Sequence, residues 1–229
     1  MVKPAPSPKQ PVPRPSFRKE RALAGDECDC VAGVDEAGRG PWAGPVVAAA
    51  VYFEHSKAAP KGLADSKLLD ANERARLYDK IRKVGVVGVG IVDVDDIDSI
   101  NILQATFRAM KEAIAALSTP PRAVIVDGNL CPPALPCRGI PVIDGDQLCP
   151  SVAAASIIAK VTRDRLMISL AQSFPGYSWE TNKGYGTREH ASAIARLGVT
   201  PHHRRSFAPI KLALSGRAAD MPLDAEAGF

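Results

Sequence analysis

The 229-residue sequence has no long hydrophobic run, few aromatic residues and no cysteine pair at metal-binding spacing. No apolar stretch reaches the roughly 20 residues that a membrane-spanning helix needs, and Met1 to Ser16 contains no apolar signal core. The five cysteines are odd in number and include no CxxC pair, which argues against a disulfide framework and a zinc site. We therefore expect a cytoplasmic protein without a membrane segment, whose cysteines are structural or incidental.

The charge of the chain shows only a small basic excess. There are 29 Lys and Arg against 25 Asp and Glu, a net charge of +4, which does not by itself indicate a polyanionic partner. Basic residues are concentrated in residues 3–21, among six prolines, and again in residues 202–205. A segment of that Pro-rich composition buries too little apolar surface to fold. We expect a flexible basic tail at residues 1–25, one folded domain at 26–214 and a frayed tail at 215–229.

Three short apolar segments of the chain lead into acidic residues. The acids are Asp35 and Glu36 after the first segment, Asp127 after the second, and Asp144 and Asp146 after the third. Ligands bind at the carboxyl edge of open α/β sheets, so we expect these acids to meet at one edge. Adjacent side chains in a regular strand point to opposite faces, so we place the end of the first strand at Asp35. The strand pattern alone does not choose between Asp144 and Asp146, which share a face.

The rest of the pattern predicts an alternation of strands and helices. We expect five strands, at 30–35, 45–53, 86–92, 123–126 and 140–143, and helices at 70–84, 100–117, 151–172 and 187–197. Asp70 has the features of a helix N-cap, with Glu73 completing a capping box. Four aspartates between residues 93 and 98 form a second candidate metal site. We prefer a structural role for them, because the first turn of a helix favours acidic residues.

An acidic cluster without paired His or Cys selects a hard cation such as Mg2+ or Mn2+. Four carboxylates suit two ions, which together activate a water and stabilise the leaving oxygen in in-line displacement at phosphorus. The alternative without a metal is that Asp35 and Glu36 are a solvent-exposed acidic pair before a turn. Basic and aromatic loops near the carboxyl end of the chain suit a nucleic-acid backbone.

Six segments of the chain occur in the order of a known family's signature motifs. They are VAGVDEAGRGPWAGPVVAAAVY, LADSKLL, VIVDGN, SVAAASIIAKVTRDR, NKGYGTREH and HRRSF, and they span roughly residues 30–208. In these segments the chain resembles bacterial ribonuclease HII, the type 2 ribonuclease H. The resemblance implies an α/β, RNase H-like fold with a central mixed five-stranded sheet flanked by helices and a C-terminal helical portion. Residues 26–214 would then form the catalytic domain.

The resemblance also implies roles for individual residues. The metal-binding acids of the family correspond to Asp35, Glu36, Asp127 and Asp146. The family's ribonucleotide-contacting motif falls on Gly38, Arg39 and Gly40, and its substrate-sensing tyrosine on Tyr185. Positions that contact phosphate or support the site fall on Ser66, Lys67, Ser156 and Lys160, although an ion pair of Lys160 with Asp164 is an equally good interpretation. We expect the histidines His190, His202 and His203 to cap helices or contact the backbone.

The activity implied by this resemblance is cleavage of the RNA strand of RNA–DNA hybrids and incision 5′ of single ribonucleotides in duplex DNA. The expected partners are these nucleic acids, and we expect a monomer that serves DNA replication and ribonucleotide repair. Two other hypotheses stay open: a non-catalytic nucleic-acid-binding module, and a two-metal nuclease that acts on DNA junctions. The first would gain nothing from four acids facing phosphate, and the second would not need the Gly-Arg-Gly motif and Tyr185.

Overall fold

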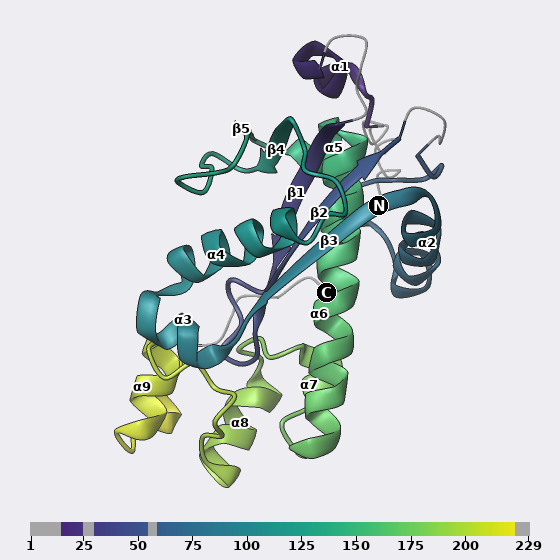
Figure 1. Ribbon diagram of the computed structural model, residues 1–229. Coiled ribbons are helices and arrows are strands. Elements are labelled where there is room, and N and C mark those ends of the chain that lie inside the picture. The colour runs from purple at the N-terminus through teal and green to yellow at the C-terminus, as the bar shows by residue number, and fades with distance from the viewer. Residues whose placement is uncertain (1–14, 25–29, 55–58, 223–229) are drawn as a thin grey trace, which may run out of the picture.

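The computed structural model describes residues 15–24, 30–54 and 59–222, and its centre is a β-sheet. The described residues form one five-stranded sheet with the order β3-β2-β1-β4-β5 (Figure 1). β1, β4 and β5 run parallel, whereas β2 and β3 are antiparallel to their neighbours. The strands are β1 (Val31–Ala37), β2 (Val46–Phe53), β3 (Gly85–Val92), β4 (Ala123–Asp127) and β5 (Arg138–Val142). The predicted mixed five-stranded sheet is therefore confirmed.

Helices cover both faces of the sheet and create two core clusters. α4 (Ile102–Ala115) packs on one face, and α2 (Ala71–Val84) and α6 (Pro150–Ser173) pack on the other. All eight residues of β2 are buried, as expected for a strand covered on both sides. α6 approaches β1 so closely that a Cβ on Gly33 would lie 2.1 Å from the backbone N of Val152. Glycine at this position lets α6 lie directly over the strand that carries Asp35.

The described residues after α6 form a helical layer beyond one end of the sheet (Figure 1). Its helices are α7 (Trp179–Asn182), α8 (Arg188–Leu197) and α9 (Ala208–Leu214). They enclose a third cluster with the second half of α6, built around Trp42, Met167 and Trp179. α8 begins where we predicted, because the Thr187 hydroxyl accepts a hydrogen bond from the backbone N of His190. The predicted C-terminal helical portion is thus present.

Both predicted tails are partly folded, in contrast to our expectation. Residues 1–14 and 223–229 lie outside the described residues, but α1 (Arg18–Ala24) is a helix and η3 (Ala218–Asp220) is a 3-10 turn. Glu20 of α1 is only 1% exposed and accepts hydrogen bonds from the N and Oγ of Ser151. Met221 is buried in the third cluster. Composition could not reveal these tertiary contacts, which offset the poor folding tendency of both segments.

The helix predicted at 100–117 is present as α4, and a separate short helix precedes it. α3 (Val94–Ile100) ends at Asn101, whose φ of 69° breaks the helix and whose side chain caps α4. The preceding aspartates have structural partners: Asp96 pairs with Arg108 at 2.8 Å, and the Asp98 carboxylate accepts from the backbone of residues 205 and 206. These contacts support the structural interpretation of Asp96 and Asp98.

The remaining elements agree with the sequence pattern at most boundaries. Asp70 caps α2 by accepting a hydrogen bond from the backbone N of Glu73, although the Glu73 carboxylate bonds to Arg76.

Within the described part of the chain no helix has the length and hydropathy to cross a membrane. The described cysteines are free, and Cys28 lies outside the described residues.

Candidate active site

Three of the four predicted acids lie at the carboxyl edge of the sheet. β1 carries Asp35 and Glu36, and Asp127 is the last residue of β4. We predicted that the first strand ends at Asp35, but β1 continues through Ala37 because both acids still pair with β2. The pairing of β1 with the shorter β4 stops at Val34. The two acids of β1 therefore lie beyond the β4 ladder, on the side where β4 ends in Asp127.

The fourth acid comes from a short helix and not from the end of a strand. Asp146 lies in α5 (Gly145–Leu148), whereas Asp144 precedes this helix in the left-handed region with φ 55°. Asp146 is 8% exposed and Asp144 is exposed. The Oδ1 of Asp127 accepts a 2.8 Å hydrogen bond from the backbone N of Gly145, which ties the end of β4 to α5. The structure thus separates the two candidates and places Asp146 near Asp127.

Burial raises the pKa of all four predicted acids, and repulsion from neighbouring carboxylates adds to this effect for Asp35, Glu36 and Asp146. For Asp35 burial is the largest cause, and the charges of Glu36 and Asp127 raise the pKa further. Burial is also the main reason that the pKa values of Glu36 and Asp127 are raised. The pKa of Asp146 rises to about 7 through burial and then through the charges of Asp65 and Asp127. Full ionisation of this cluster therefore requires compensating positive charge.

One lysine supplies part of that charge. Lys67 lies in the 3-10 helix η2 (Ser66–Leu68), after Asp65, whose Oδ1 accepts from the backbone N of Lys67 at 2.9 Å. Burial acts to lower the pKa of Lys67, but Asp65, Asp35 and the other acids outweigh it and the pKa is raised. Asp65 was missing from our predicted site. The signal that could have found it is its place in LADSKLL, directly before Ser66 and Lys67.

One of the two predicted serines, Ser156, hydrogen-bonds to Asp35, and the other, Ser66, bonds to Ser156. The hydroxyls of Ser66 and Ser156 are buried and lie 2.8 Å apart. Hydrogen bonding with Ser156 acts to lower the pKa of Asp35 and offsets part of the effect of burial. Lys160 instead forms a 3.1 Å ion pair with Asp164, in which both side chains are less than 20% exposed. The structure thus gives Lys160 the structural partner that its spacing predicted.

The predicted substrate-contacting residues form one surface beside the acids. Gly38 adopts φ 97°, a conformation that favours glycine, in the turn after β1. The exposed Arg39 places its guanidinium NH1 3.4 Å from Oε1 of Glu36. A Cβ on Gly40 would lie 3.7 Å from Cε1 of Tyr185, so this glycine and the tyrosine ring are neighbours. The fold therefore brings the Gly-Arg-Gly motif and Tyr185 together across a long sequence separation.

The four acids do not by themselves form a complete metal-coordination site. Across the described ranges, no three His, Cys, Asp or Glu side chains are grouped closely enough to hold a metal ion by themselves. Mg2+ typically takes only one or two carboxylates, with water and substrate phosphate as its other ligands. An all-oxygen set of buried carboxylates that repel one another fits such a cation.

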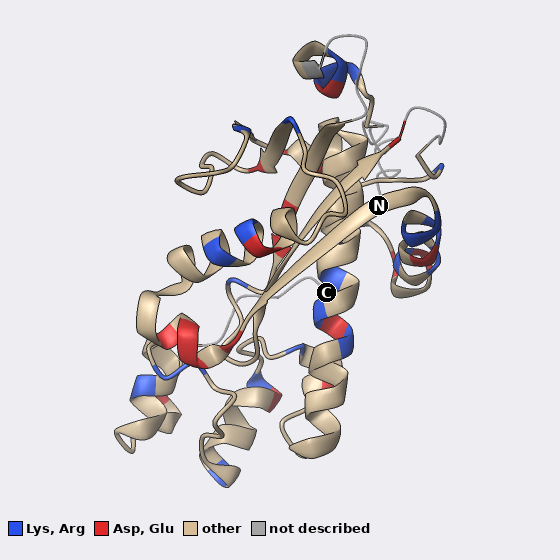
Figure 2. Ribbon diagram, viewed as in Figure 1, with Lys and Arg blue, Asp and Glu red and all other residues tan. Residues whose placement is uncertain are grey.

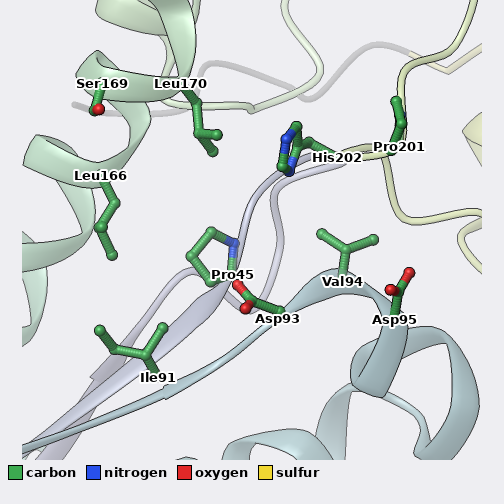
Figure 3. Close-up of a pocket in the computed structure, with 10 residues that line it drawn as sticks. All are labelled: Pro45, Ile91, Asp93, Val94, Asp95, Leu166, Ser169, Leu170, Pro201 and His202. Carbon is green, nitrogen blue, oxygen red and sulfur yellow. The ribbon is translucent and has the colours of Figure 1, made fainter. Parts of the chain in front are cut away.

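A separate pocket lies near the second candidate metal site of the sequence. It has a volume of about 440 Å³, and Asp93 and Asp95 line it together with apolar side chains that include Ile91, Leu166 and Leu170 (Figure 3). None of the four acids of the cluster lines this pocket. Figure 2 shows the acidic residues of α3 as a group of their own. The structure therefore keeps the aspartates around residue 95 apart from the candidate active site.

Comparison with known proteins adds the family to this geometry. The family model described as ribonuclease HII matches residues 32–210, which include all four acids, the Gly-Arg-Gly motif and Tyr185. The chain belongs to the ribonuclease HII family. A curated ribonuclease HII from Rhodospirillum rubrum is 55% identical over 209 residues, covering 89% of this chain and 94% of the relative. Membership in the ribonuclease HII family makes the chain a nuclease of the hydrolase class.

Solved structures of ribonucleases show the same fold. Ribonuclease H2 from Pyrococcus horikoshii is 27% identical with a TM-score of 0.67, covering 83% of this chain and 99% of that one. A ribonuclease HIII structure, Bst-RNase HIII in complex with Mn2+, is 20% identical with a TM-score of 0.68, covering 94% of this chain and 78% of that one. These similarities confirm the predicted RNase H-like fold.

Proposed function

We propose that the chain is a metal-dependent endoribonuclease that cleaves the RNA strand of RNA–DNA hybrids and incises duplex DNA 5′ of a single embedded ribonucleotide. The observation that carries the proposal is the convergence of Asp35, Glu36, Asp127 and Asp146 around Lys67, beside a surface suited to a ribose. Membership in the ribonuclease HII family supports the same conclusion. Water attacks phosphorus, the bond to the 3′ oxygen breaks, and the products carry a 3′-OH and a 5′-phosphate.

The metal is Mg2+ or Mn2+ in this proposal, bound as two ions when substrate is present. The four acids would hold the ions, and the lack of a complete cage is consistent with ligands contributed by the substrate phosphate. The related ribonuclease HIII that was solved with Mn2+ supports a divalent cation. When bound, such ions lower the pKa of a water and stabilise the leaving oxygen.

The protein's own side chains orient the substrate around this centre. Lys67 faces the acids and adds a cation that attracts the scissile phosphate. Ser156 hydrogen-bonds to the buried Asp35, and the hydroxyl of Ser66 bonds in turn to Ser156. Backbone groups of the Gly38 turn and the Arg39 side chain would contact the 2′-OH and adjacent phosphates.

Tyr185 would pack against the sugar that follows the ribonucleotide. A 2′-OH is the group that distinguishes ribose from deoxyribose, so a rigid turn that contacts it can select one ribonucleotide within DNA. The neighbouring positions of Gly40 and Tyr185 support reading of two successive sugars by one surface. A nuclease that acts on DNA junctions would not need this arrangement. A non-catalytic binding module would not need buried acids that repel one another.

The decisive experiment uses a labelled DNA duplex with one ribonucleotide, incubated with the protein and Mg2+ or Mn2+. An all-DNA duplex and a chelator serve as controls, and an RNA–DNA hybrid is the second substrate. We expect metal-dependent incision on the 5′ side of the ribonucleotide and cleavage of the hybrid. Asp127→Asn should abolish cleavage and retain duplex binding, while Asp144→Asn, at the exposed neighbouring acid, should cleave normally. Binding without cleavage by the wild-type protein would instead favour the binding module.

A further inference from the structure

Arg163 and Arg204 are the most deeply buried arginines among the described residues, and neither has a charged partner. Arg163 of α6 is 1% exposed and Arg204 is 0% exposed. No carboxylate of a described residue forms an ion pair with either guanidinium under 4 Å. Burial lowers the pKa of Arg163 to about 10 and that of Arg204 to about 9, so both are protonated at neutral pH. A buried charge is tolerated only when it is paired or fully hydrogen-bonded, so the partners of these guanidinium groups need an explanation.

The partners are backbone carbonyl oxygens of the turn that contains the Gly-Arg-Gly motif. Arg204 donates to the carbonyls of Gly38 at 2.6 Å, Arg39 at 2.9 Å and Gly44 at 2.9 and 3.0 Å, with a longer contact to Pro45 at 3.2 Å. A carbonyl that is held at a buried guanidinium fixes the orientation of its peptide plane. The backbone N–H groups of that turn are the candidates for substrate contact. Their directions are therefore fixed by the bonds that the carbonyls of the same turn accept from Arg204.

Arg163 connects this turn to the loop that carries Tyr185. Its guanidinium donates to the carbonyls of Ala43 at 3.0 Å and Pro45 at 2.9 Å on one side, and to the carbonyl of Lys183 at 2.9 Å on the other. A direct backbone hydrogen bond of 2.8 Å from Trp42 to the carbonyl of residue 184 runs alongside. One planar group thus spans both segments that would read the ribonucleotide.

Gly38 of the motif packs directly against the guanidinium of Arg163. A Cβ on Gly38 would lie 2.0 Å from Nε of Arg163, so any larger residue would displace the arginine. The Tyr185 loop is fixed on its other side as well: the Tyr185 carbonyl lies 2.8 Å from Nδ1 of the buried His190. The separation between Gly40 and Tyr185 is therefore determined by groups beneath the surface.

We propose that Arg163 and Arg204 are positioning residues for ribonucleotide recognition, which hold the Gly38–Pro45 turn and the Tyr185 loop at one fixed separation. This inference rests on the proposed function, because the two segments are taken to contact successive sugars. Arg163 joins the two segments, whereas Arg204 holds the turn alone. Neither arginine touches the substrate.

The test is a double-mutant cycle between Arg163→Lys and Tyr185→Ala on the single-ribonucleotide duplex. Lysine keeps the charge, but its single ammonium cannot reproduce a planar fork that spans three carbonyls. Misplacement of a substrate contact by about 1 Å costs about 100-fold in rate. We expect Arg163→Lys to lower the single-turnover rate by that factor in the wild-type background, and by less than about threefold when Tyr185 is already alanine. The Kd for the duplex should change little, because the phosphate contacts remain.

Two further variants separate positioning from loss of stability. Ile114→Ala, in the buried cluster under α4, which includes no residue of either segment, should lower the melting temperature, and its rate effect should be the same in both Tyr185 backgrounds. If Arg163→Lys does not fold, Arg204→Lys takes its place in the same cycle. We expect it to lower the rate because the Gly38 carbonyl loses its guanidinium donor. Equal losses from Arg163→Lys with and without Tyr185 would overturn the proposal. A wild-type protein that leaves the single-ribonucleotide duplex intact would refute the proposed function itself, and this inference with it.

Discussion

Burial of the acid cluster, together with repulsion among its carboxylates, should make the metal-free protein less stable as pH rises, and Asp146 should carry much of the effect. The pKa of Asp146 is raised from 3.8 to about 7 in the folded protein. A group with a raised folded pKa contributes its stability below the unfolded value and loses it as pH rises through the folded value. The loss therefore falls between about pH 4 and pH 7. At 1.36 kcal/mol per pKa unit the difference corresponds to about 4 kcal/mol.

That value is an upper bound, because the raised pKa reflects burial first and also repulsion that Asp146 shares with Asp65 and Asp127. We expect Asp146→Asn to stabilise the metal-free protein by about 2 kcal/mol at pH 8 and by almost nothing at pH 4. Denaturant unfolding in a chelator at both pH values measures this difference. Asp144→Asn is the matched control, since Asp144 is exposed and two residues away. Added Mg2+ should remove most of the advantage of the asparagine variant.

A metal-free Asp146→Asn protein that is less stable than the wild type at pH 8 would refute the reasoning. It would mean that Asp146 makes favourable contacts in the absence of metal, so that its carboxylate is a structural group. Equal effects of the Asp144 and Asp146 substitutions would point to overall charge and not to the cluster.

Further predictions concern binding, catalysis and stability. Asp35→Asn should abolish cleavage while a gel-shift assay shows unchanged duplex affinity, and near-normal turnover would contradict a catalytic role. Tyr185→Ala should reduce single-ribonucleotide incision by about 10–100-fold, or about 1.4–2.7 kcal/mol, and hybrid cleavage by less. Glu20→Ala should lower the free energy of unfolding by about 1 kcal/mol through loss of the cap on Ser151, measured by denaturant titration against Lys19→Ala. Duplex affinity should fall steeply with salt concentration, and a flat response would argue against phosphate contacts.

The sequence predicted those features that depend on local pattern. β2, β3 and α8 lie within a residue or two of their expected limits, because buried strands and capped helices leave clear patterns. The convergence of Asp35 and Asp127 followed from the rule that parallel strands end at one edge. The choice of Asp146 over Asp144 required the family resemblance, because the sequence pattern placed both on one strand face. In the structure Asp144 is the N-cap residue of α5 and Asp146 lies within that helix.

The features that the sequence did not reveal depend on contacts between distant segments. Arg163 and Arg204 are charged, and most arginines are exposed, so nothing local indicated that both are buried. The basic, proline-rich start of the chain likewise gave no sign that Glu20 would be buried against α6.

The position of α1 has a practical consequence for anyone who shortens this protein. The match to the family model begins at residue 32, after α1, and ends at residue 210, before Met221. Trimming to those limits would remove the acceptor for the backbone N of Ser151 and the donor at Ser16 that reaches the Leu148 carbonyl. Both bonds lie beside the turn that leads from Asp146 into α6. A version cut at the limits of the family-model match would thus keep every proposed catalytic residue and lose part of what holds one of them in place.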